Sequence, residues 1–491
     1  MFSPPSEPPE RATRAGRHRR AIRGPAGAVG AGLAALVLLT LSACVADWGA
    51  GTSASTGTPC QATARTKVPQ PKPAQLEAAG FDALPLAPDA KRVDLVAAPF
   101  SRPTEVTNPL FPISELQSVV LNGLVEGLPF RTETTLMPET RIIEWLPGHC
   151  VTTAISQYTA YLDSRIEEVA IDHYAQADDG SVWYLGEEVY NYADGVIAET
   201  SGTWLAGKEG PAAMIMPGRP RVGQALRPEN IPGLVFEEVV VTDVDVTVDG
   251  PRGRVRGALV ASELHSDGTI SDKVFAPGYG EFSSADSGDL EALAIAVPID
   301  ALPGPVPGAL KDLGDSALAV FDAAGEPDWP AAAAALARLT SAWTAQADTG
   351  EVPPRLVAPT DAAVAELTLA VAAQDGYLAR DAALLALQCA LDLQLQYLDA
   401  AEVDRARFEL WAHRVINDAA EPSLSKVAGD VSTLEWIRDR IVRTLEAAEL
   451  TRVDALLEEL RAGASEHDLA AATDAAAELL DVVEGAGFAA Q

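Results

Sequence analysis

The sequence predicts an α+β protein in which an antiparallel β region, residues 96–299, precedes an α-helical bundle, residues 312–491. Segments rich in β-branched and aromatic residues recur in the first region, and turns containing glycine separate them roughly every ten to fifteen residues. This spacing favours a β-meander over βαβ units, and a sheet of that many strands is expected to curl towards a barrel. After residue 311, alanine and leucine recur at helical spacing.

Residues 1–43 have the composition of an export signal. Six arginines precede a mostly apolar run, residues 26–43, which ends in Leu41-Ser42-Ala43-Cys44. This ending resembles the bacterial lipobox, in which the cysteine is lipidated and becomes the first residue of the mature protein. The resemblance implies that Cys44 anchors the protein in the bacterial cell membrane, facing the extracytoplasmic side. A single transmembrane helix is the alternative, because the run is nearly long enough to span a bilayer.

Residues 44–95 are predicted to form a disordered tether, because Ser, Thr, Pro, Gly and Ala dominate them and leave little to bury in a core. Export also sets the expectation for the cysteines. In an oxidising compartment, Cys60 and Cys150 are a candidate disulfide, while Cys389, in an apolar helical stretch, is expected to be a buried thiol.

The charge balance limits the partners. The chain has 70 acidic and 36 basic residues, a formal net charge of −34. Such a surface repels nucleic acid and anionic lipid, which excludes both as partners of the folded part. The sequence has no CxxC motif or Cys/His cluster, and no histidine lies at metal-ligand spacing from another, so neither a metal site nor a cofactor is predicted. Asp243, Asp245 and Asp249 alternate with valine, which indicates a strand with one solvated face rather than a calcium loop.

The stretch from Tyr174 to Tyr190 is interpreted as the central hairpin of the β region. Two strand-like segments flank Asp178-Asp179-Gly180, where glycine supplies the positive φ of a tight turn. The aromatic residues of this stretch, Tyr174, Trp183, Tyr184 and Tyr190, are the candidate ligand-binding residues. They form either one wall of a cavity for an apolar or sugar-like molecule, or ordinary cross-strand packing.

Four segments of the β region carry a resemblance to a family. NPLFP, HYAQADDGSVWYLGE, MPGRPRVGQALRPE and KVFAPGYGEF are similar, in the same order, to a run found in uncharacterised bacterial secreted lipoproteins. The chain departs from that pattern at His173, Leu185 and Tyr279, where the family has Trp, Phe and Val. The resemblance implies an envelope protein with a mostly β domain, and it implies no activity.

A Pro/Gly linker, residues 300–311, separates the two regions, and two independently folded units joined near residues 302–308 are expected. Asp328 and Thr360 are predicted helix N-caps, and short connections imply a bundle or stacked hairpins of antiparallel helices. Gln388 and Asp392, four residues apart on an otherwise apolar helix, indicate a polar stripe against a partner helix.

No catalytic residues are predicted. The sequence lacks GxSxG, and Gly314-Asp315-Ser316 is better explained as a helix cap than as an esterase nucleophile block. The first hypothesis is a non-enzymatic lipoprotein whose β region binds an apolar or envelope-derived molecule. The second is a structural or protein-interaction lipoprotein that docks through its helical bundle. The third, an envelope hydrolase, would require His173 or His265 to meet a serine and an acid.

Overall fold

A computed structural model describes residues 64–286, 288–421 and 423–485, all within one compact unit. The export signal, Cys44 and Cys60 lie outside the described residues. The description therefore begins inside the expected tether and runs to the end of the last helix.

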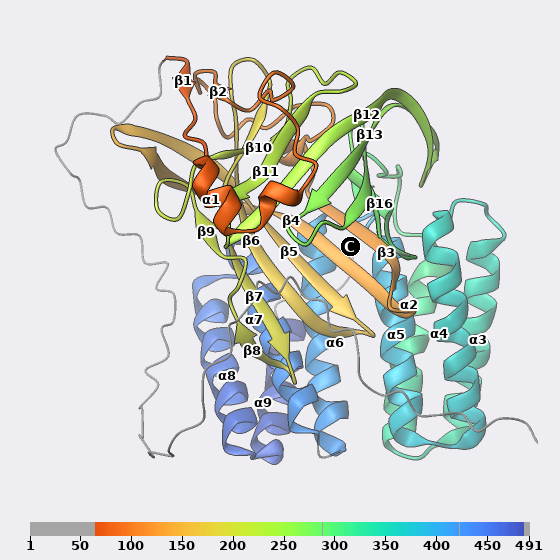
Figure 1. Ribbon diagram of the computed structural model, residues 1–491. Coiled ribbons are helices and arrows are strands. Elements are labelled where there is room, and N and C mark those ends of the chain that lie inside the picture. The colour runs from red at the N-terminus through yellow and green to blue at the C-terminus, as the bar shows by residue number, and fades with distance from the viewer. Residues whose placement is uncertain (1–63, 287, 422, 486–491) are drawn as a thin grey trace, which may run out of the picture. The chain divides into compact units, whose positions relative to one another are not determined.

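The β region is one 14-stranded antiparallel sheet (Figure 1). Its strands are β3 (Ser118–Val125), β4 (Leu128–Leu146), β5 (His149–Leu162), β6 (Arg165–Gln176), β7 (Val182–Ala193), β8 (Val196–Glu199), β9 (Trp204–Leu205), β10 (Ala213–Met216), β11 (Ala225–Ile231), β12 (Val235–Gly250), β13 (Gly253–His265), β14 (Ile270–Ala276), β15 (Gly280–Asp286) and β16 (Asp289–Val297). The order is β10-β7-β6-β5-β4-β3-β16-β15-β14-β13-β12-β11, with β8 and β9 paired to β7. Because most neighbours are consecutive in the chain, the predicted antiparallel meander is confirmed.

The sheet is curled and not closed. Glu187 on β7 and Glu229 on β11, near opposite ends of the strand order, are close enough for their carboxyl groups to share a hydrogen bond. The two ends of the sheet therefore approach each other, and one face of the sheet lies inside the curl.

The predicted hairpin turn is confirmed, but its position in the sheet is not central. Strands β6 and β7 flank the turn, and Gly180 adopts a φ of 82°. Strand β7 is next to β10, the last strand at one end of the order. The middle of the sheet is instead formed by β3 and β16. These are the first and last strands of the meander, and they pair with each other.

The second half of the expected tether is folded, which corrects that prediction. Residues 66–97 form β1 (Thr66–Lys67), α1 (Pro73–Ala78), the short helix η1 (Phe81–Ala83) and β2 (Val96–Ala97). Phe81 packs on Phe236 of β12 with ring centroids 4.4 Å apart. The Val93 amide donates to the Ala225 carbonyl at the edge of β11. The few apolar residues of this segment thus find an existing sheet to pack on, which composition alone does not reveal.

The helical region is confirmed. It comprises α2 (Gly308–Gly325), α3 (Trp329–Ala347), α4 (Pro354–Ala373), α5 (Gly376–Gln394), α6 (Ala400–Ala420), α7 (Leu424–Ile441), the short helix η3 (Val442–Thr444), α8 (Ala447–Glu466) and α9 (Leu469–Gly485). Helices α2–α5 pack together, α6–α9 pack together, and α5 contacts α6 between the two groups (Figure 1). Among the described helices, α4 is long and apolar enough to cross a membrane, and part of its length is buried in the protein.

Two of the three predicted helix caps are wrong. Asp328 does cap α3, since its carboxylate accepts the Ala331 amide at 3.1 Å. Thr360 lies inside α4, where its hydroxyl donates to the Leu356 carbonyl, and Ser316 lies in the middle of α2. Pro354 in the first turn of α4 starts that helix seven residues earlier than the threonine signal suggests.

Sheet and helices share one hydrophobic core, in contrast to the expected pair of independent units. Val120, Ile155 and Tyr161 of the sheet pack in the same cluster as the apolar residues of the helices. Helix α2 begins within the expected linker, and the Leu302 amide donates to the Gln396 carbonyl at 2.6 Å. The segment between the regions is therefore held in place at both its start and its end.

Candidate functional site

One face of strands β5–β7 packs against the helices. The Gln157 amide of β5 donates to the Trp436 carbonyl of α7, and the Trp436 indole donates to the Tyr192 hydroxyl of β7. Side chains alternate between the two faces of a strand, so the intervening residues lie on the opposite face, inside the curl. We call this the inner face; Tyr158, Asp172 and Tyr184 lie on it.

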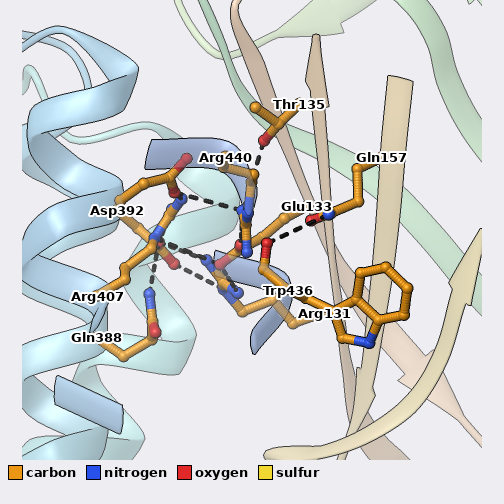
Figure 2. Close-up of polar contacts among 10 residues, drawn as sticks. Arg131, Glu133, Thr135, Gln157, Gln388, Asp392, Arg407, Trp436 and Arg440 are labelled. Atoms are coloured by element: carbon orange, nitrogen blue, oxygen red, sulfur yellow. Dashed lines mark hydrogen bonds and ion pairs between the residues drawn. The ribbon is translucent and has the colours of Figure 1, made fainter. Parts of the chain in front are cut away.

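A buried ionic network joins the sheet to the helices (Figure 2). Three arginines alternate in it with three acids: Arg131 and Glu133 from β4, Asp392 from α5, Asp404 and Arg407 from α6, and Arg440 from α7. Arg131 contacts Asp392 at 2.6 Å, and Arg440 contacts Glu133 at 2.5 Å. The expected polar stripe on α5 is part of this network, since Gln388 donates to Asp392 at 2.9 Å.

The charges of this network balance, which indicates a structural role. Burial alone would raise the pKa of Glu133, but the guanidinium groups of Arg407, Arg131 and Arg440 outweigh burial and hold that pKa well below its usual range. Glu133 is 1% exposed and Arg407 is fully buried. A closed, neutral set of ion pairs offers no free charge to a ligand, and its function is to fix the helices on the sheet.

The inner face carries a second ionic cluster, and its charges do not balance. Eight carboxyl side chains from seven strands lie on it: Glu168, Asp172, Glu187, Glu229, Glu237, Glu263, Glu281 and Glu291. Among the described residues, the cations within this cluster are Lys273 and His265. Asp172 and Glu263 are buried, and the other six carboxyl residues are partly exposed.

Hydrogen bonds and ion pairs connect the cluster around the curl. Thr132 donates to Glu291 at 2.7 Å, and Lys273 lies 3.2 Å from Glu263 and 3.7 Å from Glu281. On the other side of the cluster, the Tyr184 hydroxyl donates to Asp172. Since β16 and β6 lie several strands apart in the sheet, the curl rather than local sequence brings these groups together.

Burial, reinforced by neighbouring carboxyl groups, raises the pKa values of several members of this cluster. Burial, reinforced by Asp172, raises the pKa of Glu187 to about 8, and burial with the same neighbour raises the pKa of Glu168 to about 7. Burial and Glu281 raise the pKa of Glu291 to about 7. Burial raises the pKa of Asp172 to about 6. Several of these groups therefore hold a proton near neutral pH, because burial and neighbouring carboxyl groups destabilise their charged forms.

At one end of the cluster, His265 contacts a serine and an acid. Its Nε2 lies 2.9 Å from the Ser271 hydroxyl, and its Nδ1 lies 3.4 Å from a Glu237 oxygen. The hydrogen bond with Glu237 raises the pKa of His265. Burial alone would raise the pKa of Glu237, but His265 and Lys273 together outweigh burial and lower that pKa to about 2. Glu263 is also near, with Oε2 at 3.7 Å from His265 Nε2 and 3.4 Å from the Ser271 hydroxyl.

The predicted aromatic residues divide between the two faces. Tyr174 and Tyr184 lie on the inner face and stack with ring centroids 4.9 Å apart. Trp183 is on the opposite face, fully buried, with its indole N–H donated to the Ser181 hydroxyl. Tyr190 packs against Trp436 of α7. The four residues therefore do not line one surface.

Two of the four cysteines, Cys150 and Cys389, lie within the described residues. Cys150, at the start of β5, is disulfide-bonded. Its predicted partner Cys60 lies outside the described residues, so that pairing stays a prediction. Among the described residues, Cys389 in α5 is a free cysteine, and burial raises the pKa of its thiol to about 12.

Sequence reasoning missed the acidic inner face and the His265 contacts. One local signal was present in Glu263-Leu264-His265, because residues two apart in a strand share a face. Comparison with protein-family models and with curated proteins gives no match for this chain. The candidate site therefore rests on the geometry of its own residues.

Proposed function

We propose that this protein is a lipid-anchored extracytoplasmic binding protein whose curled sheet takes up a cationic ligand on its inner face. The observation that carries the proposal is the excess of eight carboxyl groups over Lys273 and His265 on that face. Mutual repulsion raises the free energy of the charged carboxylates, and a bound cation relieves it. Perturbed groups gathered at one place are typical of functional sites.

The proposal replaces the apolar ligand expected from the sequence with a charged one. Trp183 and Tyr190 lie away from the inner face, and both pack against protein groups. Tyr174 and Tyr184 remain on it, and the Tyr184 hydroxyl donates to the Asp172 carboxylate of the acidic cluster. Aromatic faces attract cations, so these two residues suit the same ligand class.

Cation binding should release protons. Near neutral pH, Glu187, with a pKa of about 8, is mostly protonated, and Glu168 and Glu291, with pKa values of about 7, are partly so. An approaching cation lowers these pKa values and displaces the protons. Binding should therefore become tighter as the pH rises towards 8.

The test is calorimetric titration of the full exported chain with calcium and with spermidine, in two buffers of different ionisation enthalpy at pH 7. The expected result is saturable binding of at least one cation with net proton release. Glu187→Gln should reduce the number of protons released. Asp249→Asn, a matched loss of one acid on exposed β12 surface, should leave binding and proton release unchanged. Absence of saturable binding by either cation, or equal effects of the two substitutions, would refute the proposal.

The lipid anchor is tested separately. Cells expressing the chain and supplied with a fatty-acid analogue should label the wild type, and Cys44→Ala should abolish the label. A labelled Cys44→Ala protein would contradict the anchor at this residue. The localisation proposal would then fall without affecting cation binding by the sheet.

A hydrolase is the second candidate. It is favoured by the consecutive contacts from Ser271 to His265 and from His265 to Glu237. Their distances, 2.9 Å and 3.4 Å, suit a serine activated by a histidine base that an acid orients. One feature weighs against it: the serine is 4% exposed, so a substrate has little access to its hydroxyl. A fluorophosphonate probe that labels the wild type and not Ser271→Ala would establish the hydrolase.

Docking through the helical bundle has less support. Leu369 on α4 and Leu378 on α5 are the exposed large apolar residues of the described helices. Exposed apolar residues that stand singly are normal on a protein surface. The inner face, by contrast, has a charge pattern that requires a partner.

A further inference from the structure

We propose that His265, Glu237 and Glu263 form a binding site for a first-row divalent metal ion at one end of the inner face. This inference rests on the proposed cation-binding function and names one ligand class for it. The ligand atoms of the three residues all lie within 4.8 Å of one another. An imidazole with two carboxylates is a donor set suited to ions such as zinc and manganese.

The sheet holds the three donors in fixed relation. Glu237 of β12 is paired directly with His265 of β13 in the antiparallel register. Glu263 precedes His265 by two residues, so both side chains leave the same face of β13. The donors thus come from adjacent positions on two paired strands.

Glu263 supplies an independent sign of a missing partner. Its side chain is 1% exposed, and its Oε2 receives contacts from Lys273 at 3.2 Å and from the Ser271 hydroxyl at 3.4 Å. Its other oxygen, Oε1, is buried and accepts no hydrogen bond from an N–H or hydroxyl group within the described part of the chain. A buried carboxylate oxygen without a partner is costly, and coordination to a metal ion would satisfy it.

Replacing Lys273 changes metal affinity in a direction that tests the proposed site. Its ammonium group lies between Glu263 and Glu281, at 3.2 and 3.7 Å, and competes with any ion at Glu263. Lys273→Met removes this competitor and should tighten metal binding. Damage to the sheet would weaken binding instead, so the direction of the effect separates the two explanations.

His265 separates coordination from simple charge attraction. The imidazole Nδ1 lies 3.4 Å from a Glu237 oxygen. If the acidic face attracts ions only by its charge, His265→Ala removes no negative charge and should leave binding unchanged or strengthen it. If the imidazole nitrogen is a ligand, the same substitution should weaken binding by at least about tenfold, as loss of even outer-shell groups commonly does.

The experiment uses the full exported chain without a histidine tag, stripped with EDTA and dialysed against zinc and cobalt(II). We expect one ion per chain, a visible cobalt absorption band, and loss of both in His265→Ala and Glu263→Gln. Asp249→Asn on β12 should bind as the wild type does. Circular dichroism at matched pH checks that each variant is folded.

Three outcomes would overturn the metal site: fewer than one ion per chain in the wild type, unchanged or tighter zinc binding in His265→Ala, or weaker binding in a Lys273→Met variant whose circular dichroism matches the wild type. If zinc fails while calcium or spermidine still binds with proton release, the metal site is wrong and cationic binding stands. If none of these cations binds, both proposals are wrong.

Discussion

Replacing Glu133 with glutamine tests whether the buried network fixes the helices on the sheet. The substitution keeps the shape of the side chain but removes the charge that Arg131, Arg407 and Arg440 surround (Figure 2). Three buried guanidinium groups would then face two carboxylates, leaving one positive charge without compensation. Removing one partner from a buried ion pair costs about 3–5 kcal/mol, a large part of the 5–15 kcal/mol typical of whole proteins.

The assay is urea unfolding of wild type and Glu133→Gln at pH 7, followed by far-UV circular dichroism and tryptophan fluorescence. Because sheet and helices share one core, both signals should shift together. Glu139→Gln is the matched control: Glu139 is on the same strand and pairs with Arg443, but the arginine is 61% exposed, so the loss should be below about 1 kcal/mol.

A double-mutant cycle sharpens this prediction. Arg440→Met in the Glu133→Gln background restores equal numbers of opposite charges in the network, so the double variant should lose less free energy of unfolding than the two single losses added. A loss of less than about 1 kcal/mol for Glu133→Gln would refute our account of the network. Separate transitions for the two signals would show that helices and sheet unfold independently.

Three further predictions concern the sheet. An unfolded glutamate has a pKa of about 4.3 and folded Glu187 one of about 8, so the folded state holds the extra proton between these values. The contribution of Glu187 to stability should therefore fall as the pH rises through 8, and urea midpoints at pH 5.5 and 8.5 should differ less in Glu187→Gln. Trp183→Ala should cost about 3–5 kcal/mol of unfolding free energy, because the indole fills a core; a loss under about 1 kcal/mol would return Trp183 to the candidate ligand wall. Peptide mapping without reduction should recover Cys60 linked to Cys150, and a Cys150 peptide linked to any other cysteine would contradict the pairing.

The fold class was predictable because it depends on local periodicity. The sequence itself shows turn residues such as Asp178-Asp179-Gly180 and the change to helical spacing after residue 311. The independence of the two regions was not predictable in this way. A Pro/Gly stretch such as residues 300–311 reads as a linker, while the contacts that hold it, such as Leu302 to Gln396, join residues about a hundred positions apart.

The acidic site depended on register, which local patterns do not fix. Counting back from the turn between Gly250 and Gly253 would place Glu237 opposite Ser266. The bulges in β12 shift that register by one residue, so that Glu237 pairs with His265. Since a slip of one residue reverses the face of every side chain, no reading of the sequence alone could assemble the three donors.

The two ionic clusters contain the same residue types, but the pKa values of their carboxyl groups shift in opposite directions. At the helix interface, each carboxylate faces guanidinium groups, and the pKa of Glu133 is lowered because the charged form is the stable one. On the inner face, carboxyl groups face one another, and the pKa of Glu187 is raised because the charged form lacks a partner. The first arrangement stabilises the fold without any ligand. The second opposes the fold as the pH rises, and a cation is the partner that would remove that opposition, which is why we place the function on the inner face.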